Sequence, residues 1–299
     1  MTRLLRIEHA ALFCASLSVH VYAGEATSSK NWIFAADYQY RGSDTISHSG
    51  GMTGDYGRSR TGAELIYQTS GQAIDFEWYK YVNRFGGAIA GTDRSYGDTK
   101  DVMLTGFRLW DLNQKYGLQL IYALEFAAED KVNLGSSHRW GLGCAARWRP
   151  DAETDLALGL LLEDRFESSI LPIPYVKAIW RPCRYAEVEL RATGLQNGVI
   201  IRDFLTEDHA TTLDFTVAYE TLSFRLSDAG YGSRAVAIGE VPIRVGLTQF
   251  LEASGTWFVR GSAEWVAFSR QSFKHAGETQ SSFQPGANWG LAARVGARF

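Results

Sequence analysis

Residues 289–299 read WGLAARVGARF, and every second side chain in this stretch is apolar. The apolar positions are Trp289, Leu291, Ala293, Val295, Ala297 and Phe299, and they alternate with glycine, alanine and arginine. A period of two places the two sets on opposite faces of an extended chain. The stretch therefore predicts a β-strand with one apolar face and one small or cationic face.

The same alternation runs from Asn31 to the end of the chain, and aromatic residues close the apolar phase at both ends. Three strands carry the pairs Trp32/Tyr40, Trp140/Trp148 and Trp257/Trp265. The expected strands have about 9–13 residues, the length that crosses a bilayer when tilted, whereas strands of soluble proteins average about 5–6. Aromatic rings suit the headgroup layer, and the polar phase is rich in glycine and in charges of both signs. These features favour a membrane-spanning barrel with a wet or salt-bridged lumen over a soluble β-sandwich.

Long polar segments alternate with short turns along the chain, as the outer loops and periplasmic turns of outer-membrane barrels do. The long segments are 42–58, 86–100, 129–137, 166–173, 227–233 and 271–287. The predicted strands are 31–41, 59–68, 72–84, 100–110, 115–127, 138–149, 154–165, 174–182, 185–193, 197–204, 210–224, 235–249, 256–270 and 288–299. We expect an all-β fold, an antiparallel transmembrane outer-membrane β-barrel of about 14 strands. Without the pair 185–193 and 197–204, the count is 12, and both numbers are even.

Composition excludes several other classes of protein. The 299 residues include 30 Lys and Arg against 33 Asp and Glu, a net charge of −3, which gives no electrostatic case for binding nucleic acid. A hydrophobic content of 45% argues against intrinsic disorder. The mean hydropathy is −0.17, and the chain has no apolar run of about 18 residues, so a helical membrane protein is excluded.

The N-terminal residues have the three parts of an export signal. Arg3 and Arg6 precede a short apolar stretch at 10–19, and small residues precede a cut near Ala23. We expect residues 1–23 to be a signal peptide, 24–30 a periplasmic stub and 31–299 the barrel, located in the bacterial outer membrane. Cys144 and Cys183 then remain, and whether they pair is left open.

Residues 155–182, DLALGLLLEDRFESSILPIPYVKAIWRP, carry three short motifs. These are Asp164-Arg165-Phe166, Leu171-Pro172-Ile173-Pro174 and Trp180-Arg181-Pro182. With these motifs the chain resembles an uncharacterised family of bacterial outer-membrane β-barrel proteins, a domain of unknown function, mainly over residues 155–190. The resemblance implies the barrel and its location, and it implies no activity. The segment 195–206 departs from the family's alternation.

The inward phase of the predicted strands supplies the candidate site. The lumen or selectivity candidates are Glu163, Arg165, Lys177, Arg181, Glu187, Glu189, Arg191, Arg260, Glu264 and Arg294. The same phase also carries Asp37, Glu64, Asp75, Glu77, Glu125, Arg139 and Arg147. Such charges form either a salt-bridge ladder that holds the wall or a ring that selects solutes by charge. Phe299, after a well-alternating strand, resembles the signal that barrels present to the barrel-assembly machinery.

We expect a porin-like passive channel for small polar solutes, with outer-membrane lipid and lipopolysaccharide as its surroundings. One alternative is a surface hydrolase acting on lipid or peptide, for which the strongest suspects are Ser136-Ser137-His138, with His48 and His275 in other outer loops. Another is a closed structural or adhesive barrel. The chain has no CxxC, HExxH, EF-hand or phosphate-loop spacing, so no metal or cofactor is expected.

Overall fold

The computed structural model describes residues 32–299 except 48–52, 91, 93–94, 167, 194–196, 228–234, 253–254 and 276–277. The predicted signal peptide and periplasmic stub lie outside the described residues, so both stay predictions. The described residues contain no helix with the length and apolarity that a membrane crossing requires.

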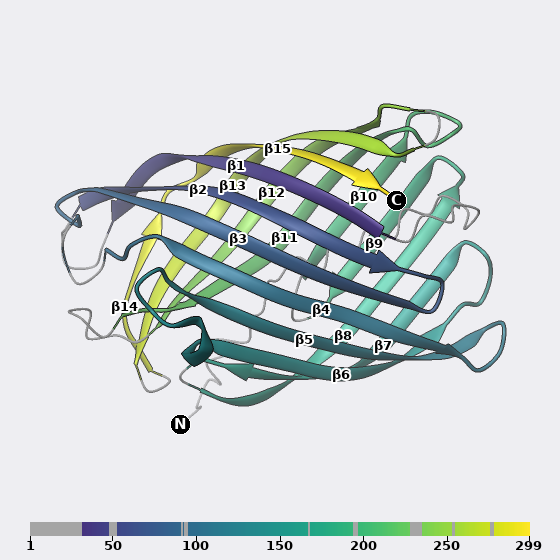
Figure 1. The fold of residues 1–299 in the computed structure, drawn as a ribbon, viewed down its shortest axis with the longest axis horizontal. Helices are drawn as coiled ribbons and strands as arrows, with labels where there is room; N and C mark the ends of the chain where they lie inside the picture. The colour runs from purple at the N-terminus through teal and green to yellow at the C-terminus, as the bar shows by residue number, and fades with distance from the viewer. Residues whose placement is uncertain are drawn as a thin grey trace, which may run out of the picture.

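The strands form one closed antiparallel barrel (Figure 1). They are β1 (Trp32–Ser47), β2 (Thr53–Gln68), β3 (Gln72–Gly87), β4 (Thr99–Asp111), β5 (Tyr116–Glu129), β6 (His138–Trp148), β7 (Thr154–Arg165), β8 (Ser168–Cys183), β9 (Ala186–Ala192), β10 (Asn197–Phe204), β11 (Thr211–Arg225), β12 (Ala235–Phe250), β13 (Trp257–His275), β14 (Glu278–Pro285) and β15 (Asn288–Arg298), with one 3-10 turn, η1 (Leu134–Ser136). Both β14 and β15 lie between β13 and β1, so they are two parts of one wall position. The barrel therefore has 14 strands.

The first and last strands close the barrel. β1 pairs with β15 from Ile33 opposite Arg298 to Arg41 opposite Gly290. At the end of this seam, Trp32 and Phe299 exchange two backbone hydrogen bonds of 3.0 Å. β9 and β10 pair with each other over their whole length, which confirms the count of 14 rather than 12. We call the end of the barrel that holds Trp32, Phe299 and the short turns the inner end, and the opposite end the outer end.

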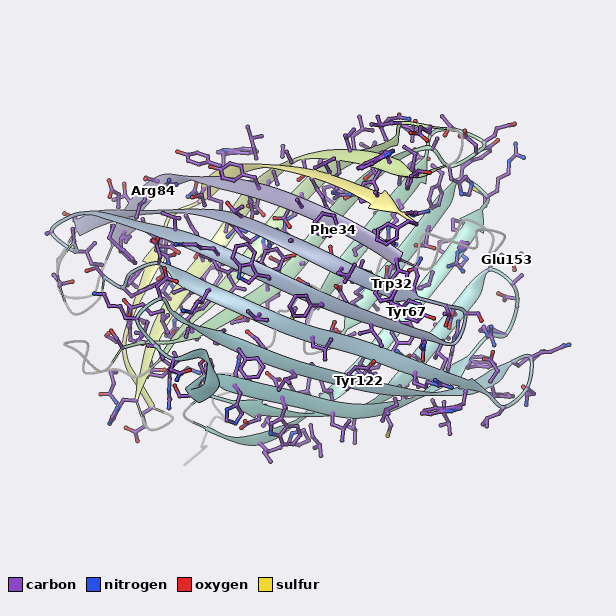
Figure 2. All side chains as sticks on the ribbon, viewed as in Figure 1. Trp32, Phe34, Tyr67, Arg84, Tyr122 and Glu153 are labelled. Atoms are coloured by element: carbon purple, nitrogen blue, oxygen red, sulfur yellow. The ribbon has the colours of Figure 1, made fainter. Side chains whose placement is uncertain are left out.

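The outward face is apolar, as the alternation predicts. On β1, Trp32, Phe34, Tyr38 and Tyr40 are exposed, whereas the alternate residues Ile33, Ala35, Asp37 and Gln39 point inward and are buried. Aromatic residues form a belt near the inner end; its members are Trp32, Tyr67, Trp110, Tyr116, Trp148, Trp180 and Trp257. Figure 2 shows Trp32 and Tyr67 side by side on neighbouring strands, with ring centroids 4.8 Å apart.

A second aromatic group lies eight residues further along the strands. Trp265 on β13 stacks on Trp289 of β15 with ring centroids 6.1 Å apart, and Tyr40 lies at the corresponding height on β1. Eight residues of extended chain span about 26 Å along the strand, or about 20 Å of height at a tilt of about 40°, so the two aromatic groups lie near the edges of an apolar band about 25 Å tall. The outward face therefore has the dimensions of a membrane-crossing surface.

Several strands extend further toward the outer end than predicted. β1 continues to Ser47 and β2 begins at Thr53, so most of the predicted loop 42–58 is strand and this prediction was wrong. The predicted loop 271–287 was also wrong, because β13 continues to His275 and β14 occupies Glu278–Pro285. β8 likewise begins at Ser168, within the predicted loop 166–173. Beyond the bilayer the outward face no longer needs to be apolar, so the hydropathy alternation ends while the backbone ladder continues.

The two cysteines are free thiols, and both are exposed on the barrel surface. The pairing that the sequence leaves open is therefore not formed.

Candidate functional site

Six residues on β8, β9 and β10 form a network that we call the basic ladder. Its carboxylates are Glu187 and Glu189, and its cations are Lys177, Arg181, Arg191 and Arg202. Glu189 accepts hydrogen bonds from Arg191 Nε at 2.5 Å and Arg202 Nη1 at 3.0 Å, and Lys177 Nζ lies 3.5 Å away. Glu187 accepts from Arg181 Nε at 2.9 Å and also pairs with Arg202. Four cations against two carboxylates leave the ladder with an excess of positive charge.

A second network joins β1 and β2 to β12 and β13. Glu264 on β13 accepts hydrogen bonds from Arg41 Nε at 2.5 Å and Arg244 Nε at 2.7 Å. Arg41 also pairs with Glu240, which accepts a bond of 2.8 Å from Arg58. Because a planar guanidinium binds two carboxylates at fixed angles, this network ties β1 and β2 to β12 and β13.

The other predicted lumen residues lie apart from these networks. Arg260 donates to Asp214 at 2.7 Å, and Arg294 pairs with Glu64. Glu163 is fully buried on β7. The side chain of Arg165 lies outside the described residues.

The structure thus distributes the predicted charges over several ion-pair networks, and their role in selecting solutes stays a prediction. The predicted lumen residues did not include Arg41, Arg202, Glu240 and Arg244, although these four lie on the inward phase of their strands, the signal that identifies such residues.

The outer end of the lumen is filled by apolar and aromatic side chains, a cluster that we call the outer plug. Its members are Ile46, Tyr56, Tyr79, Tyr81, Ile89, Tyr96, Ala127, Phe224, Leu226, Val236, Ile238, Phe273 and Phe283. Tyr81 on β3 meets Phe224 on β11 with ring centroids 5.3 Å apart, and Tyr96, from the segment between β3 and β4, lies 6.1 Å from Phe273. The expected wet or salt-bridged lumen does not extend to this end, where the inward side chains beyond the charged zone are apolar and aromatic.

Backbone contact across the barrel closes the same end. β5 and β11 are separated by five strands in the wall, yet Arg225 pairs in parallel with Ala128. Beside this contact, buried Glu129 accepts hydrogen bonds from the Gly97 N–H at 2.8 Å and from the Ser227 N–H and hydroxyl at 3.0 and 2.8 Å. One carboxylate thereby holds the β3–β4 segment and the end of β11 against β5, an arrangement that we call the Glu129 clasp.

The inner end instead contains a cavity of about 610 Å³, the inner vestibule. Five cationic side chains line it, namely Lys115, Arg147, Arg149, Lys177 and Arg181, with the carboxylates of Asp151 and Asp155. A smaller cavity of about 30 Å³ lies beyond it, lined in part by Tyr175, Lys177 and Arg191. Lys177 lines both cavities, so the vestibule leads from the inner turns toward the basic ladder.

The hydrolase suspects are held by the backbone of their own turn. Ser136 Oγ donates to the Asn133 carbonyl at 2.8 Å, and His138 Nδ1 lies 3.3 Å from the Gly135 carbonyl. These contacts give both side chains a structural role in the turn around η1. Ser137 is buried and His275 is exposed at the end of β13, while His48 lies outside the described residues.

Neither a scan of protein-family models nor a search of curated proteins finds a match for this chain. The resemblance of residues 155–190 to an uncharacterised barrel family therefore stays a prediction.

Solved barrels do resemble it in shape. An outer membrane channel from Pseudomonas putida F1 aligns with a TM-score of 0.46 and 13% identity, covering 92% of this chain and 98% of that one. The monoaromatic hydrocarbon channel TodX, as a deletion mutant, gives 0.42 and 8%, with 92% of both chains covered. The KdgM porin gives 0.35 and 8%, with 87% and 97% covered. Similarity at this level assigns no function to the chain.

Proposed function

We propose that this protein is an outer-membrane channel for small polar solutes and that the channel favours anions. We further propose that the conformation described above is the closed one. The inner vestibule is the observation that carries the proposal. It is a cavity large enough for small solutes, it leads from the inner turns into the barrel, and cations predominate among its charged lining residues. Cationic side chains at a constriction favour the entry of anions.

The outer plug supplies the gate of the proposed channel. Its outer closure depends on aromatic packing, one pair of strand residues in parallel contact and the three hydrogen bonds of the Glu129 clasp. These contacts join segments beyond the apolar band, so they can part without breaking the ladder of the wall. Passage of solute requires this separation.

The location in the outer membrane belongs to the same proposal. The exposed apolar band with an aromatic belt at each edge supports contact with lipid, and lipopolysaccharide would surround the outer part. Phe299 lies at the inner end of the closing seam and is 59% exposed, so its ring is available to the barrel-assembly machinery.

Single-channel recording tests the proposal. Purified barrel, verified as folded by the difference in gel mobility between unboiled and boiled samples, is reconstituted in a planar bilayer with a salt gradient. We expect brief discrete openings and a reversal potential on the anion-selective side. Folded wild-type protein that never conducts would contradict the channel.

A closed structural or adhesive barrel is the second candidate, and the outer plug is the observation that favours it. The two candidates differ in one result: a structural barrel conducts only after the plug is disrupted by substitution, whereas the proposed channel opens with its native residues.

A further inference from the structure

The smaller cavity at the end of the inner vestibule lies on the inward face of β4, β5, β8 and β9. Its volume of about 30 Å³ holds one small group rather than a whole solute. Phe107 and Ile121 contribute apolar surface, and the polar side chains that line the cavity are Gln119, Tyr175, Lys177, Arg191 and Thr193. Among the described residues, none of those that line it is Asp or Glu, whereas Asp151 and Asp155 line the vestibule. The lining of the smaller cavity therefore suits an anionic group.

Tyr175 provides a buried hydrogen-bond donor at this cavity. The residue is 5% exposed, and it belongs to a buried apolar cluster with Ile121 and Ala157, which holds its ring in place. Its oxygen accepts a hydrogen bond from Gln119 Nε2 at 3.3 Å, and its own proton has no acceptor among the described residues. Turning the Gln119 amide over would reverse this bond and leave the amide N–H donors unused instead, so the pair has a spare donor in either orientation. Because a buried donor without an acceptor is destabilising, the pair points to a ligand that accepts a hydrogen bond here.

Lys177 adds a positive charge to the same cavity. It follows Tyr175 by two residues on β8, so the two side chains share the inward face of the strand. Lys177 Nζ lies 3.5 Å from Glu189, farther than the roughly 2.7–2.9 Å of a charge-assisted hydrogen bond. The ammonium group has three N–H donors, so it can donate to a ligand in the cavity while Glu189 remains nearby.

We propose that the smaller cavity binds the carboxylate group of a small organic acid, whose hydrocarbon part lies in the vestibule. A carboxylate has two oxygens, so it can accept from the Lys177 ammonium and from the Tyr175–Gln119 pair together. Apolar side chains line both spaces, with Phe107 shared between them and Leu109 and Ile179 in the vestibule. Such a lining favours an anion with attached hydrocarbon over a hydrated inorganic ion. The inference rests on the proposed function, and it narrows the favoured anions to organic carboxylates.

Fluorine NMR with para-fluorobenzoate as the probe tests the site without requiring conduction. The full-length barrel in detergent, included only when its gel mobility shows the folded form, is titrated with the probe, and the broadening of the fluorine line gives the affinity. The uncharged para-fluorobenzyl alcohol reports binding to the detergent alone. The variants Tyr175→Phe and Lys177→Met each remove one polar group and keep most of the side-chain volume. Their matched controls are Tyr122→Phe on β5, between two inward residues and labelled in Figure 2, and Lys131→Met at an exposed outer position.

We expect saturable binding of para-fluorobenzoate to the wild type and to both controls. Tyr175→Phe and Lys177→Met should each lower the affinity by about tenfold or more, because each removes a hydrogen bond to a charged group. Unlabelled benzoate should displace the probe, and chloride at the same concentration should not.

Three results overturn the proposal: a wild-type barrel without saturable binding, either variant binding as tightly as the wild type, or chloride displacing the probe as well as benzoate does. A barrel that binds the probe as expected but never conducts in a bilayer supports the site and contradicts the channel, so the failure of one proposal is distinguishable from the failure of the other.

Discussion

Glu129 joins three segments that are far apart in the chain. Its two oxygens accept hydrogen bonds from Gly97 and Ser227 while its backbone ends β5. A carboxylate that accepts several bonds in a buried place contributes more than a neutral acceptor, because charge-assisted hydrogen bonds are the stronger class. The clasp therefore contributes directly to the balance between the closed and open outer end.

Glu129→Ala should increase the open fraction of the channel by about tenfold or more, because hydrogen bonds to a charged group contribute about 1.5–3 kcal/mol and about 1.4 kcal/mol is a factor of ten. Single-channel recording of open probability measures the effect. Glu153→Ala, in an exposed inner turn, is the control and should leave the open probability unchanged (Figure 2 labels Glu153). Equal open probabilities for the two variants would show that the clasp does not hold the gate.

Lys177 lines both the vestibule and the smaller cavity, so its charge acts where the two cavities meet. Lys177→Glu should shift the reversal potential toward cations and lower the anion preference several-fold, because charged residues at a constriction set selectivity. Lys131→Glu makes the same change of charge at an exposed outer position and is the control. An unchanged selectivity in Lys177→Glu would mean that ions do not pass this point.

At the scale of the strand, the position of a residue relative to the bilayer decides how much a substitution lowers the free energy of unfolding. Leu158 lies mid-strand on β7 and is 67% exposed, while Leu112 is 64% exposed but lies in an inner turn. The two leucines have nearly the same exposure, so their substitution removes a similar amount of packing. A difference between the two variants in the free energy of unfolding therefore reports the surroundings of the two positions.

Leu158→Arg should lower the free energy of unfolding by about 2–4 kcal/mol, whereas Leu112→Arg should change it by about 0–1 kcal/mol, because the cost of a cation falls from the bilayer midplane to the interface. Denaturant unfolding of the barrel in lipid vesicles measures both. Equal costs at the two positions would contradict the assignment of the outward face to the membrane.

The sequence predicted the strands correctly where they lie within the bilayer and incorrectly where they extend beyond it. Within the apolar band the alternation of β1 and β13 predicted correctly which side chains point outward, because lipid requires an apolar face there. Beyond the band both predicted loops at 42–58 and 271–287 were wrong, since a strand in water shows no such pattern. The strands 185–193 and 197–204, which the sequence left open as a pair, are formed as β9 and β10 and pair with each other.

The candidate site was less predictable for a different reason. The inward phase identified Lys177, Glu187 and Glu189 as lumen residues, but which charges meet depends on strand tilt and on contacts across the barrel. Phe224 and Tyr81 belong to strands eight positions apart in the chain order, and no local pattern predicts that their rings touch. The outer plug therefore appeared only with the three-dimensional structure.

At the scale of the molecule, the barrel is asymmetric along its axis. The outer end is closed by aromatic packing and by β5 meeting β11, and the inner end contains the cationic vestibule. This asymmetry is what a channel closed at one mouth requires. Opening then means that β5 and β11 separate at Ala128 and Arg225 while the wall stays intact.

A reversible cross-link at that contact tests the central claim most directly. Ala128→Cys and Arg225→Cys introduce the thiols, and Cys144→Ser with Cys183→Ser removes the native ones. Paired residues of neighbouring strands have Cα atoms about 5 Å apart, within the range that a disulfide spans. Conductance of the same reconstituted barrel is recorded before and after a reductant is added. We predict silence while the disulfide is formed and discrete openings after its reduction, whereas the same conductance in both states would contradict an outer gate at β5 and β11.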